Sequence, residues 1–386
     1  MIKAFINYAQ DLYQTREFIP LHAPSFQGNE RFYVVDTIDS TFVSSVGKYV
    51  DQFESSIEEF TSANKAVATV NGTAALHAAL FMAGVGARDL VITQALTFVA
   101  TCNAISHLGA EPLFVDISKK SLGLCPESTE AFLIENAFIN DDGYCIHRQT
   151  NRHIRALVPM HTFGHPVELD EITELCSRWN IILIEDSAES LGSYYKGQHT
   201  GTFGRFGVLS FNGNKVITTG GGGMILCQDN ADGIHAKHIT TTAKKPHAYE
   251  FFHDELGFNY RMPNINAALG CAQMESLQLF LDKKRELADC YSQFFAGSEF
   301  KFVEEPGYAK SNYWLNAVIC ESSRARDNFL KETNENGVMT RPVWQLMNRL
   351  PMFSGCIKND LPVSEYIEGT LVNIPSSPII NEPVIK

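Results

Sequence analysis

The sequence predicts an α/β protein with a large domain built on a mostly parallel sheet and a small α+β domain at its C-terminal end. Short apolar strands alternate with helical segments between residues 65 and 227, which is typical of a sheet covered by helices on both faces. The segment 180–185 contains the run Ile-Ile-Leu-Ile, which suits a strand buried on both sides. The chain has 386 residues, too many for one small core, so two domains are expected.

The first strand of this pattern leads into a turn that can hold an anion. Residues 65–70 are an apolar strand, and Asn71-Gly72-Thr73 precedes a helix expected to begin at Ala74. A helix N-terminus presents N–H groups without intrahelical partners, so it can bind a phosphate, with the Thr73 hydroxyl as a further donor. The alternative is a tight turn in which Thr73 only caps the helix.

The following elements continue the alternation. Strands are expected at residues 90–93, 112–117, 156–159, 180–185, 206–211 and 223–227, and helices at 54–60, 99–108, 169–179 and 232–243. Residues 18–24 form an extended arm marked by prolines. Residues 119–153 are more polar and contain no motif.

Two reactive side chains directly follow strands of this sheet, at the edge where α/β proteins place their chemistry. Asp186 could accept a charge-assisted hydrogen bond from a protonated ring nitrogen, or it could cap a following helix. Lys215 lies on an irregular loop before the glycine run 220–223. Freeing its neutral amine at pH 7 costs about 4 to 5 kcal/mol, so a reactive lysine must be desolvated or already held as an imine. By itself, Lys215 could equally be a solvated loop residue.

A long helix beginning at Pro263 or Asn264 marks the expected domain boundary. Residues 1–262 would form the large domain with an N-terminal arm, and residues 263–386 the linking helix and the small domain. A strand at 313–320, a helix at 324–334 and an extended segment at 338–344 are expected there.

Composition and charge argue against several classes of protein. The net charge of −13 opposes non-specific binding of nucleic acid. The nine cysteines show no C-x-x-C pair and no metal-ligand spacing, which indicates reduced thiols and predicts no metal site. No segment approaches the roughly eighteen apolar residues of a membrane span, so we expect a cytoplasmic protein without a membrane partner.

Together, an anion-binding turn, a carboxylate and a lysine are the partners that pyridoxal phosphate needs for its phosphate, its ring nitrogen and its aldehyde. The chain resembles the DegT/DnrJ/StrS family of sugar aminotransferases over nearly its whole length. The resemblance rests on Gly72–Leu76, Thr97–Thr101, Glu185–Ala188, Ser210-Phe211 with Lys215, Gly257–Met262 and Thr340–Trp344. It implies an aspartate aminotransferase-like fold (fold type I), with a seven-stranded, mostly parallel sheet in a large domain that binds pyridoxal phosphate. It also implies a homodimer with shared active sites.

The resemblance implies individual roles as well. Lys215 would bond to the cofactor and then move a proton between cofactor and substrate, and Asp186 would hold the pyridine N–H. The other implied cofactor contacts are Phe98, stacked on the ring, Gly72, Thr73, Ala74 and Ser210 at the phosphate, and Asn259 at the phosphate of the neighbouring subunit. Phe98 could instead be a core residue and Ser210 an ordinary strand-end donor, and Arg261 is an alternative to Asn259.

Two positions depart from the pattern of the family. Glu189 stands where Gln or His is common and would face the phenolic oxygen of the cofactor. An anionic side chain there would repel the phenolate unless it is protonated or turned away. We retain Glu189 as a cofactor contact. Asn212 stands where many relatives have His.

The form Ser-Phe-Asn-Gly-Asn-Lys at 210–215, with Ser44–Lys48 and Thr340–Trp344, resembles the subgroup that acts on UDP-linked 4-keto-6-deoxy-N-acetylhexosamines in bacillosamine and legionaminic acid pathways. It implies amino transfer from L-glutamate to such a sugar. The expected substrate contacts are Lys48, Arg261, Arg341 and Trp344. The alternatives are a GDP- or dTDP-linked keto sugar aminated at C3 or C4, or a non-catalytic regulator of the same fold. Lys215 argues against the dehydratase branch of the family, which has His at this position.

Overall fold

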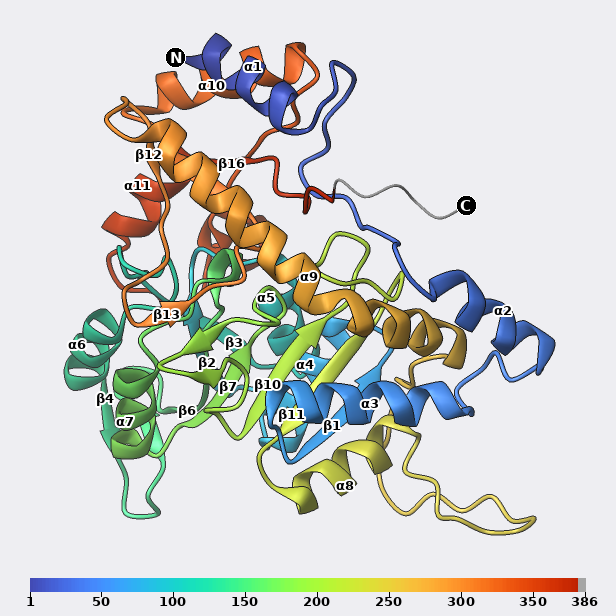
Figure 1. Cartoon of the computed structure of the whole chain (residues 1–386). Helices are drawn as coiled ribbons and strands as arrows, with labels where there is room; N and C mark the ends of the chain where they lie inside the picture. The colour runs from blue at the N-terminus through green and yellow to red at the C-terminus, as the bar shows by residue number, and fades with distance from the viewer. Residues whose placement is uncertain (381–386) are drawn as a thin grey trace.

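The central layer of the computed structural model, which describes residues 1–380, is a nine-stranded sheet (Figure 1). Seven strands cross it in the order β1-β11-β10-β7-β6-β2-β3. Their bounds are β1 Lys65–Thr69, β2 Leu90–Gln94, β3 Glu111–Val115, β6 Arg152–Val158, β7 Ile182–Asp186, β10 Phe206–Ser210 and β11 Gly223–Cys227. From β10 to β3 all neighbours are parallel, whereas β11 is antiparallel to both β1 and β10. The short strands β4 Ala137–Ile139 and β5 Cys145–His147 extend the sheet beside β6. This confirms the expected α/β class and the mostly parallel sheet.

Alternate side chains of the strands supply two apolar faces, and helices cover both. The face that carries Val67, Val91 and Ile184 packs against α4 Gly72–Met82, α5 Val99–His107 and α8 Asn230–Thr240. On the other face, α3 Lys48–Thr61 and α9 Asn264–Phe295 cover the strands around β11. On this same face, α6 Pro126–Asn136 and α7 Leu169–Trp179 cover the strands around β2.

Helix α9 is 32 residues long and leads into the second part of the molecule (Figure 1). A four-stranded antiparallel sheet there has the order β12-β14-β16-β15, with β12 Lys301–Phe302, β14 Asn316–Ile319, β15 Arg341–Pro342 and β16 Leu371–Ile374. Helices α10 Ser323–Glu335 and α11 Pro362–Thr370 complete this part. A third small sheet pairs β13 Ala309–Lys310 with β8 Tyr194–Tyr195 and β9 Gln198–His199, so it ties the second part to the loops of the first.

The N-terminal segments lie along both parts of the chain. Helix α1 Ile2–Leu12 packs in one apolar cluster with the second half of α9 and with α10, and its Phe5 ring lies 5.2 Å from the Phe329 ring. Helix α2 Glu30–Asp39 lies along the first half of α9. The first helix therefore packs with the segment expected to be the small domain, although it precedes the expected boundary at 262/263. That boundary remains a proposal, and residues 381–386 of the expected small domain lie outside the described residues.

Element bounds agree with the sequence prediction where a capping residue or a buried run defines them. Helix α7 and strand β11 have the expected bounds. Strand β7 begins at Ile182 and not at Asn180, because Asn180 adopts a left-handed conformation (φ 50°) that ends α7. The polar stretch 119–153 contains α6, β4 and β5, elements too short or too weakly periodic to be predicted.

Within residues 1–380, no helix has the length and apolar character required to cross a membrane.

Candidate active site

A pocket of about 300 Å³ lies at the carboxyl edge of the central sheet. Its walls come from the turn after β1, the start of α5, the segments after β7 and β10, and two tryptophans of the second part of the chain. The expected site residues that line it are Gly72, Thr73, Phe98, Asp186, Glu189, Ser210, Lys215 and Trp344. The structure therefore brings the amine, the acid and the anion-binding turn together in one pocket.

One end of the pocket is the first turn of α4. Asn71 is the cap of this helix, since its Oδ1 accepts a hydrogen bond from the Ala74 N–H at 2.8 Å. Thr73 therefore lies inside the helix and does not cap it. A Cβ on Gly72 would lie 3.0 Å from the Cβ of Ser210, so the helix can approach the end of β10 this closely because residue 72 is glycine. First-turn N–H groups and the Ser210 hydroxyl thus converge, as an anion requires.

Asp186 ends the central strand β7 and is only 6% exposed. Its Oδ2 accepts a hydrogen bond from Thr101 Oγ1 at 2.7 Å, and its Oδ1 accepts one from the Ala188 N–H at 3.2 Å. Residues 187–193 form turns and no helix, so the helix-cap alternative is wrong. Because an ionised carboxylate has about four acceptor positions, this oriented group can still accept a bond from a ring N–H.

The preceding carboxylate, Glu185, has a structural role. It is fully buried, and its oxygens accept hydrogen bonds from the N–H groups of Gly201, Phe203 and Gly204 at 2.7 to 2.9 Å. Burial alone would raise the pKa of Glu185, but the hydrogen bond and charge of His161 and these N–H groups outweigh it and lower the pKa. Glu185 therefore fixes the loop after β9, and its oxygens are occupied by this loop.

Lys215 and Glu189 face each other across the pocket. The Nζ of Lys215 lies 3.6 Å from Oε1 of Glu189, and the Phe163 N–H donates to Oε2 of Glu189 at 2.9 Å. Burial raises the pKa of Glu189 to about 7, although the charge of Lys215 and the Phe163 N–H act against this rise. Burial also lowers the pKa of Lys215, while Glu189 and Asp186 act in the opposite direction. The two shifts bring the pKa values of Lys215 and Glu189 closer together than those of the free side chains.

Aromatic rings form the remaining walls. The Phe98 side chain is 50% exposed and its ring lies 6.3 Å from the Trp344 ring, so Phe98 is not a core residue. Trp314, which sequence reasoning missed, places its ring 3.9 Å from the Nζ of Lys215. Met160, also missed, lies on the pocket wall after β6. Trp314 precedes β14 in the second part of the chain, and the only available signal was that it is one of three tryptophans.

Five expected contacts do not line this pocket in a single described chain: Lys48, Ala74, Asn259, Arg261 and Arg341. Lys48 is 69% exposed at its side chain and pairs with Asp36 at 2.9 Å. Arg341 donates to Asn334 and to the Thr340 carbonyl. The Ala74 N–H is already used by the helix cap.

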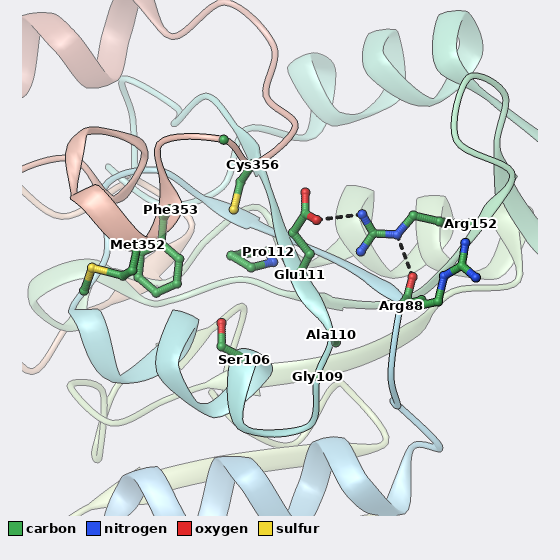
Figure 2. A pocket seen from close by; sticks show the side chains of 11 residues that line it. Arg88, Ser106, Gly109, Ala110, Glu111, Pro112, Arg152, Met352, Phe353 and Cys356 are labelled. Carbon is green, nitrogen blue, oxygen red and sulfur yellow. Dashed lines mark hydrogen bonds and ion pairs between the residues drawn. The ribbon is translucent and has the colours of Figure 1, made fainter.

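A second, more open hollow of about 600 Å³ lies at the opposite edge of the sheet, where β3 and β6 begin (Figure 2). Figure 2 shows the Arg152 guanidinium paired with Glu111, at 2.6 Å, and bonded to the Arg88 carbonyl. Because these polar groups already bind one another, we place the active site in the smaller pocket.

The site defines a class of protein. A buried lysine, an oriented buried carboxylate, and a helix N-terminus that glycine lets approach a strand end have the chemistry to bind the aldehyde, ring nitrogen and phosphate of pyridoxal phosphate. The fold is that of sugar aminotransferases that depend on pyridoxal phosphate.

Comparison with known proteins agrees. The chain belongs to the DegT/DnrJ/EryC1/StrS aminotransferase family, which it matches over residues 24–385. It is an aminotransferase that depends on pyridoxal phosphate. Relatives named GDP-perosamine synthase are 35% identical in Escherichia coli O157:H7, over 96% of each chain, and 33% identical in Vibrio cholerae, over 95% of this chain and 96% of that one. The fold is also that of the aminotransferase TlmJ from Streptoalloteichus hindustanus, with a TM-score of 0.84 at 24% identity over 93% of each chain.

Proposed function

We propose that this aminotransferase moves an amino group from L-glutamate to a keto sugar linked to a nucleotide, with Lys215 as its reactive amine. The observation that supports it most is the convergence of Lys215, Asp186 and the first turn of α4 on one pocket. Bound there, pyridoxal phosphate supplies an aldehyde carbon that carries the amino group and a ring that accepts electrons.

The residues of the chain would divide the remaining tasks. The first turn of α4 and the Ser210 hydroxyl would bind the phosphate, and Asp186, oriented by Thr101, would keep a proton on the ring nitrogen. The neutral amine of Lys215 would take a proton from the substrate carbon at its Nζ and return it. Phe98 and Trp344 would exclude water from one side of the pocket.

The relatives favour GDP over UDP as the nucleotide. The motif at 210–215 led us to expect a UDP-linked sugar, whereas the two relatives above are named for a GDP-linked product. We therefore propose a GDP-linked keto-6-deoxy sugar as substrate, with UDP- and dTDP-linked keto sugars as the alternatives. The carbon aminated is proposed to be C4.

The test is a panel of GDP-, UDP- and dTDP-linked 4-keto sugars, each incubated with L-glutamate and analysed by mass spectrometry. We expect an amino sugar nucleotide from the GDP-linked compound, 2-oxoglutarate in equal amount, and neither product with Lys215→Ala. Amination of only the UDP-linked compound would overturn the choice of nucleotide. Turnover by Lys215→Ala at the wild-type rate would overturn the assignment of the reactive amine.

A second copy of the chain is proposed to complete the site. Apolar side chains are exposed on α2 and the segment after it, and on the loop between α8 and α9. Figure 1 shows this loop as a long excursion from the body of the molecule. The exposed side chains are Phe32, Val35, Ile38, Phe42, Val43 and Val46 in the first group, and Tyr249, Phe251, Phe252 and Leu256 in the second. The first group is tied to the start of α9, because the Asn264 side chain donates to the Phe42 carbonyl and its N–H donates to the Ser44 carbonyl. Large exposed apolar areas of this kind mark interfaces.

Lys48 begins α3 just after the first group, and Asn259 and Arg261 lie on the loop between α8 and α9. None of the three lines the pocket of its own chain. In the proposed homodimer, Asn259 would reach the phosphate in the neighbouring pocket, and Lys48 and Arg261 would contact its substrate. Light scattering should give the mass of two chains for the wild type and of one chain for Phe32→Glu/Ile38→Glu. The exposed control Ile134→Glu on α6 should remain a dimer. A wild-type protein with the mass of one chain would contradict the proposal.

A further inference from the structure

Trp314 is held beside Lys215 by three hydrogen bonds. Its ring N–H donates to the Asn214 carbonyl at 2.6 Å, its backbone N–H donates to Asn312 Oδ1 at 2.8 Å, and its carbonyl accepts from the buried Lys284 at 3.1 Å. The indole is therefore fixed from the lysine loop, from its own segment and from α9. The Nζ of Lys215, 3.9 Å from the ring centroid, lies at the distance of a strong cation–π contact.

The second wall, Glu189, is tied to Trp314 through Asn312. The Asn312 side-chain amide donates to the carbonyls of Glu189 and Leu191, each at 2.9 Å, while its Oδ1 accepts from Trp314. The approach depends on Gly164 (φ +96°), where a Cβ would lie 1.8 Å from Asn312 Oδ1. A ring face and a carboxyl group are thus set at a fixed separation on two sides of one amine.

We propose that Trp314 is a positioning residue, whose indole face and the Glu189 carboxyl together hold the ammonium of Lys215 at the pocket wall whenever this amine is not bonded to the cofactor. The inference rests on the proposed role of Lys215. A released lysine that stays between these two groups keeps out of the space that an incoming substrate needs. The amine also stays close enough to bond to the cofactor again without a movement of the backbone. Sequence reasoning assigned no role to Trp314.

A contact of this kind stabilises the charged amine, so it should change the pH at which Lys215 loses its proton. The other titratable groups that face Lys215 are Glu189, Asp186 and His22. Burial, with the nearby charges of Lys284 and Lys215, holds the pKa of His22 well below its usual value, and the pKa of Glu189 is about 7. In alkaline solution these two groups have already lost their protons, so an alkaline titration reports Lys215.

The test measures the reactivity of Lys215 in the full-length chain after pyridoxal phosphate has been removed. Trace acetylation by acetic anhydride across a pH series, read by mass spectrometry relative to the exposed Lys119, gives the fraction of neutral amine at each pH. We expect Trp314→Leu to move the profile to lower pH, so that at a fixed pH below its midpoint Lys215 reacts about tenfold faster, relative to its alkaline plateau, than in the wild type. Trp314→Phe, which keeps a ring face, should shift it less.

The control is Trp344→Leu, because this tryptophan lines the same pocket and its ring lies 5.4 Å from Phe163 and 6.3 Å from Phe98. Among the cation–π pairs of residues 1–380, none joins Trp344 to Lys215. The profile of Trp344→Leu should match the wild type. If Trp314→Leu changed only the acetylation rate of Lys215 at the alkaline plateau, the substitution would have altered only the access of the reagent, and the proposal would be overturned. Equal midpoints for Trp314→Leu and the wild type would also overturn it. Circular dichroism confirms folding, and Trp314→Phe serves if Trp314→Leu does not fold. The readout needs no turnover, so it separates this inference from the proposed function.

Discussion

Glu189 should make the stability of the cofactor-free protein depend on pH in a direction opposite to that of most carboxylates. Burial raises its pKa from 4.5 to about 7, so the folded chain binds this proton more tightly than the unfolded chain does. The stability contributed by the protonated form is complete below the unfolded pKa and is lost as the pH rises through the folded one. The whole difference corresponds to about 3 kcal/mol, of which roughly 2.5 kcal/mol falls between about pH 5 and about pH 8.

Glu189→Gln removes this titration but keeps an oxygen that can accept the Phe163 N–H. Urea unfolding across this pH range should therefore show the wild type losing stability relative to the variant by roughly 2 to 3 kcal/mol. The matched control is Glu174→Gln on α7, where the glutamate side chain is 73% exposed, and its profile should run parallel to the wild type. Parallel profiles for Glu189→Gln and the wild type would refute the reasoning.

Three further substitutions test the geometry of the pocket. Asp186→Asn removes a charge-assisted acceptor for the ring nitrogen, so the turnover number should fall about 10- to 100-fold while the unfolding midpoint changes little; an unchanged turnover number would contradict the role. Gly72→Ala places a Cβ 3.0 Å from the Ser210 Cβ, so an absorbance titration should show pyridoxal phosphate binding weakened by about 1 to 3 kcal/mol. Equal affinity would contradict the proposal that the first turn of α4 and Ser210 bind the phosphate. Asn312→Ala leaves two buried carbonyls and the Trp314 N–H without their partner, so urea unfolding should show the free energy of unfolding reduced by about 2 to 4 kcal/mol. A reduction below about half a kcal/mol would contradict the role of Asn312 in linking Trp314 to Glu189.

Local sequence patterns were enough to predict the parts of the site that lie within one strand, turn and helix. The strand before Asp186, the turn at Gly72 and the lysine loop each carry their own signal of hydrophobic run and turn residues. Because carboxyl ends of parallel strands meet at one edge, their convergence followed from the predicted sheet. The sequence did not decide whether Thr73 and Asp186 cap helices or face the pocket, since capping depends on which nearby side chain accepts from the free N–H groups and on whether a helix follows. In the structure Asn71 does so at α4.

The contacts that sequence reasoning missed are long-range in the chain. Trp314 reaches the pocket because Asn312 and Lys284 fix a segment that follows Lys215 by about a hundred residues, and nothing near Trp314 in the sequence indicates this. Helix α1 was itself not predicted, and its packing against α10 is long-range as well, since even an amphipathic helix does not identify its partner. Strands of two residues, such as β12 and β15, carry too little pattern to be predicted.

The place of β11 in the sheet has a consequence for the order in which the chain can fold. Strand β1 pairs with β11, and Thr69 meets Gly223 more than 150 residues later in the chain. During synthesis the first strand therefore has to wait, without its neighbour, until most of the large sheet has emerged. Non-local pairing of this kind slows folding and leaves strand edges open to other chains. We expect nascent chains that stop before residue 223 to associate with chaperones or to aggregate, and the site to assemble only after β11 has inserted.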